Sequence, residues 1–210
     1  MVYLPPHFTE TREAVLFDHI ERHDFGLLVT QGAHGAGGMI ASQVPFLVER
    51  RDEKLYLLGH LARPNPQCGD LETGEALAIF QGPHAYISPS WYSAGPAVPT
   101  WNYASVHAYG AARVIADREW LSDLLRRLSE RHEAREATPW RMQDQPEAFL
   151  SGMLNGIVGF EIAVTRLEGK FKLSQNRPAT DRPRIVAALE ARDDADSHGV
   201  AELMREREGA

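Results

Sequence analysis

The chain has 210 residues, 43% of them hydrophobic, and a formal net charge of −7 at pH 7. This size and composition are typical of a folded protein with one sizeable core. No apolar run approaches the ~20 residues of a membrane-spanning helix, and the first residues, MVYLPPHFTE, lack the basic start and apolar centre of a signal peptide. We therefore expect a cytoplasmic protein without a membrane partner, and the negative charge disfavours DNA binding unless basic residues gather in one patch.

The cysteine and histidine content argues against several kinds of site. Cys68 is the single cysteine, so the chain can form neither an internal disulfide nor a zinc site built from several thiolates. The nine histidines show no HExxH motif and no clustered spacing with acidic residues, so we predict no metal site. Ser88 and Ser90 flank Pro89 without the glycines of a GxSxG elbow, which gives a serine hydrolase no support.

The first half of the chain predicts one helix and then a series of strands. Residues 9–23 place apolar side chains at helical spacing, with Thr9 or Thr11 available as the N-cap. Strands are expected over residues 25–31, 39–49, 54–61, 76–81, 85–88 and 102–115, and a glycine-rich hairpin loop over residues 32–38. Because no long helix separates these strands, the pattern favours an antiparallel barrel or sandwich over a parallel α/β sheet.

The second half predicts helices and one more pair of strands. Asp117 is placed to cap an amphipathic helix with a leucine stripe and a face of alternating arginines and glutamates. Shorter helices are expected over residues 146–154, 183–192 and 200–208, and strands over 157–167 and 171–174 with a turn at Glu168 and Gly169. The polar segment DDADSHG before the last helix is typical of a loosely attached tail or a partner-binding arm. The fold class is thus mostly β with flanking helices (α+β), with about eight strands.

Residues 82–110, GPHAYISPSWYSAGPAVPTWNYASVHAYG, contain two tryptophans, four tyrosines and two histidines. Pro89, Pro96 and Pro99 restrict the backbone, and the aromatic rings offer stacking area with polar edges. We interpret the segment as a surface for a flat ligand. An aromatic corner of the core or a dimer interface would have a similar composition.

A turn at residues 59–67, GHLARPNPQ, has residues suited to an anion. His60, Arg63 and Asn65 lie in this proline-containing turn, where an arginine fork, an amide and backbone donors can bind a phosphate. A surface turn with one solvated arginine is the alternative interpretation.

The segment GKFKLSQNR, residues 169–177, places Lys170, Lys172 and Ser174 on one side of a predicted strand. Residues 166–184 contain six basic residues against two acidic ones, which makes this the clear cationic cluster of the sequence. Such a cluster suits a phosphate-bearing ligand or a nucleic-acid backbone. The alternative is a solvent-facing strand edge that lysines protect from aggregation.

Four segments, GHLARPNPQ, GPHAYISPSWY, VPTWNYASVHAYG and GKFKLSQNR, together resemble the PaiB-type family of FMN-binding negative transcriptional regulators, over most of the chain. The resemblance implies an antiparallel split β-barrel of the kind shared with pyridoxine-phosphate oxidases and flavin reductases, usually a homodimer with flavin at the subunit interface. We expect an FMN-binding split-barrel domain with inserted helices over residues 1–180, and a helical C-terminal extension over 181–210.

FMN needs an anion clamp for its phosphate, an aromatic or apolar surface for its isoalloxazine ring, and donors near its pyrimidine edge. The residues expected to bind it are Ser42, Gln43, His60, Arg63, Asn65, Trp101, Tyr103, His107, Lys170 and Lys172. Arg63 with Asn65, and Lys170 or Lys172, are candidates for the phosphate end. Trp101, Tyr103 and His107 are candidates for the ring, with Ser42 and Gln43 as polar contacts. Because split-barrel sites are shared between subunits, some of these could contact the partner's flavin.

The resemblance implies a flavoprotein, either an FMN sensor or a small flavin-dependent oxidoreductase, that acts as a negative transcriptional regulator. No residue is assigned as catalytic, although His107 is the natural proton donor if turnover occurs. One alternative is a DNA-binding repressor without redox turnover, although no clear helix-turn-helix is present. The other is a haem-binding or haem-degrading split barrel, because barrels of this architecture handle haem and nine histidines offer ligands.

Overall fold

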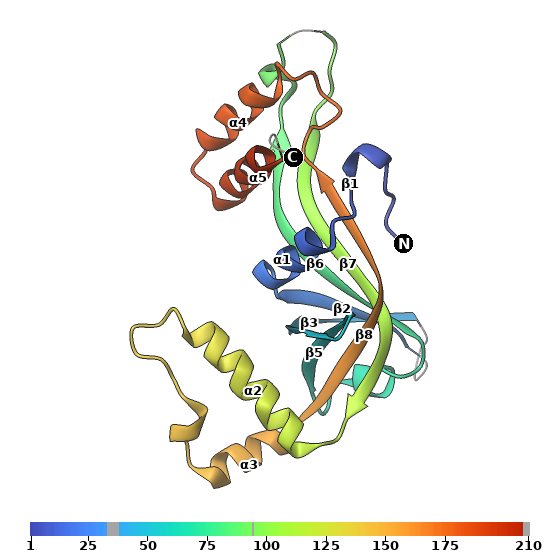
Figure 1. Cartoon of the computed structure of the whole chain (residues 1–210), viewed down its shortest axis with the longest axis vertical. Helices are drawn as coiled ribbons and strands as arrows, with labels where there is room; N and C mark the ends of the chain where they lie inside the picture. Colours follow the sequence, from blue (N-terminus) through green and yellow to red (C-terminus); the bar gives the residue numbers. More distant parts are fainter. Residues whose placement is uncertain (33–37, 94, 208–210) are drawn as a thin grey trace. The chain divides into compact units, whose positions relative to one another are not determined.

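Eight strands form an antiparallel sheet in the computed structural model, which describes residues 1–32, 38–93 and 95–207 (Figure 1). The strands are β1 (Thr9–Glu10), β2 (Phe25–Gly32), β3 (Gly38–Pro45), β4 (Leu47–Arg51), β5 (Lys54–Ala62), β6 (Glu75–Ile87), β7 (Thr100–Ile115) and β8 (Ile157–Lys172). Their hydrogen-bonded order is β3-β2-β6-β7-β8-β5-β4, and β1 pairs with β8. The predicted fold class, mostly β with flanking helices, is confirmed.

Helices flank and connect these strands. The α-helices are α1 (Glu13–Arg22), α2 (Arg118–Glu133), α3 (Glu147–Asn155), α4 (Arg182–Glu190) and α5 (Ala195–Glu206), and the 3-10 helices are η1 (Pro6–Phe8), η2 (Pro66–Gly69), η3 (Pro89–Trp91) and η4 (Met142–Asp144). As predicted, Asp117 caps α2, because its carboxylate accepts hydrogen bonds from the N–H groups of Glu119 and Trp120. The predicted hairpin loop at residues 32–38 lies largely outside the described residues. No helix in the described part of the chain is long and apolar enough to cross a membrane.

The chain divides into two compact units. Unit 1 comprises Met1–His19, Gln81–Val106 and Glu168–Ala210, and unit 2 comprises Ile20–Phe80 and His107–Leu167. Strands β6, β7 and β8 each contain residues of both units. The predicted domain boundary at residue 180 stays a prediction, and α4 and α5 are grouped in unit 1 with residues that precede it.

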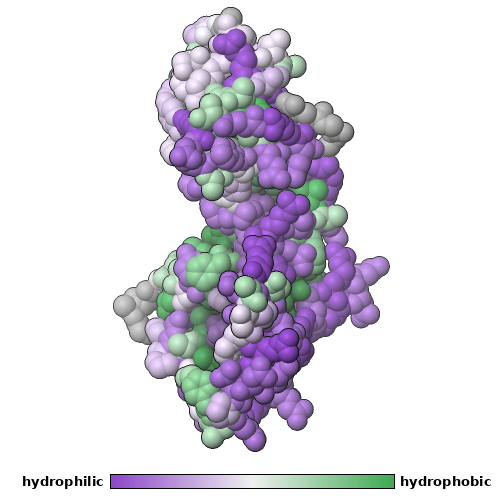
Figure 2. All heavy atoms as spheres, turned by 90° about the vertical axis from the view of Figure 1, so that its left-hand side faces the viewer, coloured by the Kyte–Doolittle hydropathy of each residue, from purple (hydrophilic) through white to green (hydrophobic). Residues whose placement is uncertain are grey.

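In unit 2, α2 packs its leucine stripe against β4, β5 and α3. The buried members of this cluster are Leu47, Leu58, Leu121, Leu124, Leu128 and Leu154. A second buried group contains three aromatic rings: Phe46 lies edge to face with Phe80, at 5.3 Å between centroids, and with Phe160, at 6.1 Å. On the face drawn in Figure 2, hydrophilic side chains predominate, with smaller hydrophobic areas between them.

In unit 1, α4 and α5 lie side by side and contribute to the core (Figure 1). Ile185, Leu189, Val200 and Met204 are completely buried. The Asp194 carboxylate caps α5 by accepting a hydrogen bond from the Ser197 N–H at 2.7 Å. The expectation of a loosely attached tail is therefore wrong: α5 begins at Ala195 rather than residue 200, and its apolar side is packed.

Two predicted strand breaks are absent, because the glycines concerned allow close packing rather than turns. β8 continues through Glu168 and Gly169, and a Cβ at Gly169 would lie 2.2 Å from Cδ2 of Leu16. β6 likewise continues through Gly82, where a Cβ would lie 2.5 Å from Cε1 of His19. A glycine in a strand can mark close approach of a neighbour as well as a turn, and here it marks close approach.

Two other boundaries differ from the prediction. The single strand expected over residues 39–49 is divided into β3 and β4, because the chain turns away at Pro45 and the Phe46 N–H donates to the carbonyl of Asp24 at 2.8 Å. At the N-terminus, Thr9 and Glu10 form β1 opposite Lys170 and Gly169 instead of starting the helix.

Gly110 in β7 provides a direct test of such close packing. A Cβ at this position would lie 2.1 Å from the carbonyl oxygen of Ala163, a backbone atom of β8. Gly110→Ala should therefore lower the free energy of unfolding by about 3 kcal/mol, since relief requires a backbone shift. Urea denaturation measures this loss. Gly74→Ala is the control, because a Cβ there has nothing within 4 Å; equal losses in the two variants would contradict the prediction.

Candidate functional site

The ten residues predicted to bind the cofactor are distributed over both units. Unit 1 contains Trp101, Tyr103, Lys170 and Lys172, and unit 2 contains the other six. The contacts of each group are described within its own unit.

Lys170 and Lys172 lie next to aromatic side chains at the end of β8. The Lys170 Nζ is 5.3 Å from the ring centroid of Tyr3 and 5.7 Å from that of Tyr103, distances within cation–π range. The Lys172 Nζ donates hydrogen bonds to Oγ1 of Thr100, at 2.6 Å, and to the carbonyl oxygen of Trp101. The structure therefore brings all four predicted residues of unit 1 into one group, which we call the lysine–aromatic cluster: Lys170, Lys172, Trp101, Tyr103 and Tyr3.

The charges in this cluster are crowded. Lys170 is only 9% exposed. Burial lowers the pKa of Lys172, and the positive charges of Lys170 and Arg177 lower it further. Like charges held close together repel one another, so a bound anion would stabilise this arrangement.

Trp101 presents its indole to the surface next to two side chains of β6. It is 53% exposed, and its ring lies 6.0 Å from that of Tyr86 and 6.1 Å from that of His84. The Nδ1 of His84 lies 3.7 Å from Oδ1 of Asp196 on α5. Sequence reasoning marked this aromatic segment but did not single out His84 or Tyr86. Their spacing of two residues, which places both on one face of a strand, was the available signal.

The rest of the GKFKLSQNR motif shapes the turn after β8. Ser174 has a φ of 62° and so lies beyond the strand, which corrects its predicted place beside Lys170 and Lys172. Its hydroxyl and the Asn102 amide exchange hydrogen bonds of 2.9 and 3.2 Å in the core. Gln175 accepts from the Leu173 N–H at 2.7 Å, and the Arg177 guanidinium lies 4.1 Å from the ring centroid of Tyr92. These side chains fix the backbone that carries the lysines.

In unit 2, the predicted residues Ser42 and Asn65 are in contact. The Asn65 amide donates to Oγ of Ser42 at 2.9 Å, and its carbonyl oxygen accepts from the Gln67 N–H at 2.9 Å, which caps η2. Gln67 is completely buried, and its amide donates to the carbonyls of Leu28 and Ile40 and to Thr30. Gln67 was not predicted, and it holds η2 against β2 and β3.

Arg63 contacts backbone carbonyls in this structure. Its Nε donates to the carbonyl of Asn155 at 2.7 Å and its Nη2 to that of Ile157 at 2.9 Å, where α3 ends and β8 begins. Two of its donor groups are thus engaged in holding this junction, although the side chain remains exposed. Arg63 has fewer donors available for a phosphate than its residue type alone indicates.

The remaining predicted residues of unit 2 lie on three different strands. His60 is opposite Gly159, and burial lowers the pKa of its imidazole, so the neutral form is favoured. Its Nδ1 is buried without a hydrogen-bond partner among the described residues. Gln43 is exposed on β3 opposite Leu27, and the His107 ring on β7 lies 6.4 Å from that of Tyr109.

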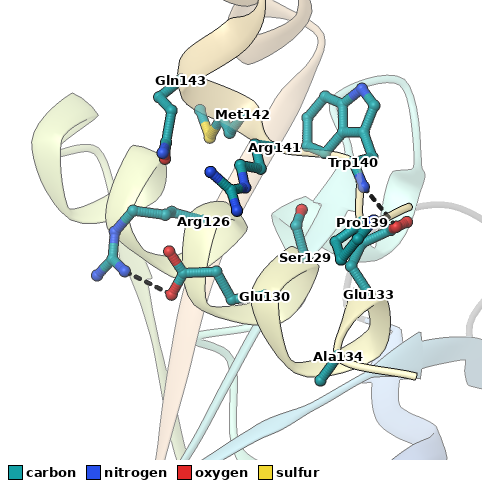
Figure 3. A pocket seen from close by; sticks show the side chains of 10 residues that line it. All are labelled: Arg126, Ser129, Glu130, Glu133, Ala134, Pro139, Trp140, Arg141, Met142 and Gln143. Atoms are coloured by element: carbon teal, nitrogen blue, oxygen red, sulfur yellow. Dashed lines mark hydrogen bonds and ion pairs between the residues drawn. The ribbon is translucent and has the colours of Figure 1, made fainter. Parts of the chain in front are cut away.

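Unit 2 also has a hollow of about 360 Å³ between α2 and the segment that contains η4 (Figure 3). Arg126 pairs with Glu130 at 2.7 Å, and the Trp140 N–H donates to the Glu133 carboxylate at 2.7 Å. None of the predicted cofactor-binding residues lines this hollow. Its lining is therefore separate from the residues that the aromatic and basic motifs point to.

Comparison with known proteins places the chain in a family. A family model described as "Putative FMN-binding domain" matches residues 2–166. The chain belongs to this family. It is 36% identical over 207 residues, 98% of both chains, to the protease synthase and sporulation protein PAI 2 of Bacillus subtilis. The PaiB-type resemblance and FMN as the cofactor are thereby confirmed.

Solved structures of low sequence identity share the fold. A flavocytochrome from Azotobacter vinelandii has a TM-score of 0.53 at 11% identity, with 80% of this chain and 72% of that chain covered. The FAD and haem binding protein from Mycobacterium smegmatis has a TM-score of 0.52 at 17% identity, with coverage of 85% and 79%. The predicted split-barrel fold agrees with these neighbours.

The lysine–aromatic cluster has the chemistry that FMN requires. Lysine ammonium groups bind phosphate oxygens with charge-assisted hydrogen bonds, and aromatic rings with exposed faces suit a flat heterocycle. Within unit 1, the positive charges of Lys170 and Lys172 are close together, and Lys172 contacts the backbone carbonyl of Trp101, whose indole is exposed. The residues present therefore fit the cofactor.

Proposed function

We propose that this protein is a flavin-dependent regulator, which binds FMN at the lysine–aromatic cluster and uses the redox state of the flavin as its signal. The observation that carries the proposal is the crowding of Lys170, Lys172 and Arg177 beside aromatic rings in a protein of net charge −7. The family assignment supports the cofactor, and the name of the Bacillus relative supports a regulatory role.

The chain's own residues have distinct roles in this proposal. Lys170 and Lys172 neutralise the phosphate, and Trp101 and Tyr103 cover the isoalloxazine ring. Thr100 orients the Lys172 ammonium through its hydroxyl. Bound FMN supplies one- and two-electron redox chemistry. The six predicted residues of unit 2 stay predictions for contacts with FMN, and we expect a homodimer in the cytoplasm.

Regulation through direct DNA contact by α2 is disfavoured, because three of its four arginines pair with carboxylates and the fourth, Arg118, donates to Asn155 and Ser151. Arg126 pairs with Asp123 and Glu130, Arg127 pairs with Glu49 at 2.7 Å, and Arg131 pairs with Asp24 at 2.8 Å. The paired carboxylates offset the positive charge that would otherwise attract a phosphate backbone. We therefore propose that regulation acts through the flavin state and a protein partner.

The test is to purify the protein, record its absorbance spectrum and titrate the apoprotein with FMN. We expect a flavin spectrum and saturable binding of one FMN per chain. Reduction of the flavin by NADH or NADPH, followed at the flavin absorbance band under anaerobic conditions, would indicate an enzyme. No reduction by either would favour a sensor. Haemin in place of FMN is the control; a Soret band without FMN binding would favour the haem alternative and contradict the proposal. A salt-dependent shift of promoter DNA by the protein alone would contradict the indirect mode of regulation.

A further inference from the structure

Unit 1 contains a second hollow, of about 340 Å³, where β1, the end of β8 and the end of α5 meet. Its lining includes the charged residues Glu10, Arg12 and Arg207 and the rings of Phe8 and Phe171. Phe171 and Lys172 are neighbours in β8, so their side chains point to opposite faces of the strand. Neither lysine lines the hollow, although the Lys172 Nζ lies 5.6 Å from the ring centroid of Phe8, which does line it.

The single carboxylate in this hollow is fully engaged by two guanidinium groups. Oε1 of Glu10 accepts from the backbone N–H of Arg12 at 2.9 Å and from its Nε at 3.0 Å. Oε2 accepts from Nη2 of Arg12 at 2.8 Å and from Nη2 of Arg207 at 3.3 Å. The charged residues that line the hollow therefore carry one more positive charge than negative charge.

The two arginines retain donors and repel each other. The Arg207 side chain is only 10% exposed and lies 4.0 Å above the Phe171 ring, yet its Nε and Nη1 donate to no partner among the described residues. Burial lowers the pKa of Arg207, Glu10 raises it, and the charge of Arg12 lowers it again. The charge of Glu206 also raises the pKa of Arg207, although the Glu206 side chain lines a different hollow. An anion that accepts from both guanidinium groups would relieve the repulsion.

We propose that this hollow is a binding site for a small tetrahedral anion, namely phosphate or the phosphate group of a small ester, held between Arg12 and Arg207. Phe8 and Phe171 are 7% and 2% exposed, so they offer little apolar surface to a large ligand. Arginine forks match the geometry of phosphate oxygens better than a single ammonium does. The inference does not depend on the proposed flavin function.

Occupancy of this site would connect the two ends of the chain within unit 1. Arg12 follows β1, and Arg207 follows α5. An anion shared by their guanidinium groups would add a contact between the N-terminal segment and the last helix. Binding should therefore stabilise the packing of α5, because a ligand that binds only the folded state shifts unfolding to higher temperature.

The experiment is a titration of the full-length, FMN-saturated protein with sodium phosphate at constant ionic strength, set with sodium chloride. Calorimetry measures the affinity, and the melting temperature provides a second readout. We expect saturable binding with a rise in melting temperature, and about tenfold weaker affinity in Arg12→Gln, which removes one charge-assisted contact. Arg12 is 53% exposed, so this variant should remain folded. A titration with glycerol phosphate shows whether a free anion or an ester is preferred, and binding of either supports the site.

Arg205→Gln is the matched control. Arg205 is also on α5, is 59% exposed and pairs with Glu190, but it does not line this hollow. Its affinity for phosphate should equal that of the wild type. Three results would overturn the proposal: no saturable binding by the wild type, equal affinity in Arg12→Gln, or equal weakening in both variants. Loss of FMN together with phosphate in Arg12→Gln would also overturn it, because the hollow would then be part of the cofactor site.

Discussion

The Lys172→Met variant is expected to bind FMN about 10- to 100-fold more weakly than the wild type, since a hydrogen bond to a charged group contributes about 1.5–3 kcal/mol. Methionine keeps most of the apolar part of the side chain, but removes the ammonium group and with it the cation–π contact of Nζ with the Phe8 ring at 5.6 Å. Quenching of FMN fluorescence on addition of apoprotein measures the dissociation constant. The melting temperature of the apoprotein shows whether the variant remains folded.

Lys54→Met is the control for this experiment. The chain has three lysines, and Lys54 is the one that lies outside the lysine–aromatic cluster, exposed at the start of β5 in unit 2. We expect its FMN affinity to be unchanged. Wild-type FMN affinity in both Lys172→Met and Lys170→Met would rule out the proposed phosphate contact. FMN would then bind at another place in the protein.

The same cluster predicts a pH dependence of FMN binding. Burial, with the charges of Lys170 and Arg177, lowers the pKa of Lys172 from its ordinary value. The ammonium form, which attracts phosphate, is therefore lost at a lower pH than in a solvent-exposed lysine. FMN affinity should fall as the pH rises through the alkaline range, and the fall should be smaller in Lys172→Met. A pH profile identical in the two proteins would assign the effect to another group.

Replacing Glu10 with glutamine should lower the free energy of unfolding by about 3 kcal/mol, as expected when one partner of a buried ion pair is removed. Glu10 is 8% exposed, and its loss would leave the Arg207 guanidinium buried without its carboxylate. Chemical denaturation near neutral pH measures the difference. Glu53→Gln, at an exposed position in unit 2, is the control and should have little effect.

The size of the Glu10 effect should depend on pH. Burial alone would raise the pKa of this carboxyl, but the hydrogen bonds and charge of Arg12, with the charge of Arg207, lower it from 4.5 to about 2. The folded state therefore binds fewer protons than the unfolded state between these values, and stability rises with pH in that window. The contribution of Glu10 is complete above pH 4.5 and is lost as the pH falls towards 2. The difference in free energy of unfolding between wild type and Glu10→Gln should therefore shrink as the pH falls over this range. A difference that stays constant would show that the ion pair is not its source.

Local patterns predicted most of the fold. The strand positions, the cap at Asp117 and the succession of strands without long helices between them depend on side-chain periodicity and on residues close in the chain. The errors arose where distant contacts override a local signal. Gly169 was predicted to lie in a turn, but it lies in a strand, where Leu16 packs against it. The polar start of α5 predicted a loosely attached tail, but the apolar side of this helix packs in the core of unit 1.

The candidate site shows the same division. Residue type predicted that Lys170, Lys172 and Arg63 can bind an anion. In the structure, Arg63 donates to backbone carbonyls. The two lysines instead lie close together beside aromatic rings. The pairing of Glu10 with Arg207 joins residues 197 positions apart and has no local signature.

The amino-acid order by itself determined the fold class, the family and the cofactor. Hydrophobic periodicity, helix capping and long motifs with rare residues all depend on residues that are close together in the chain. Only the tertiary structure decided which polar groups are already paired and which remain available to a ligand. The physical reason is that a residue's chemistry sets how many hydrogen bonds and charges it can offer. Burial and partners distant in the chain determine how many of these the folded protein itself uses.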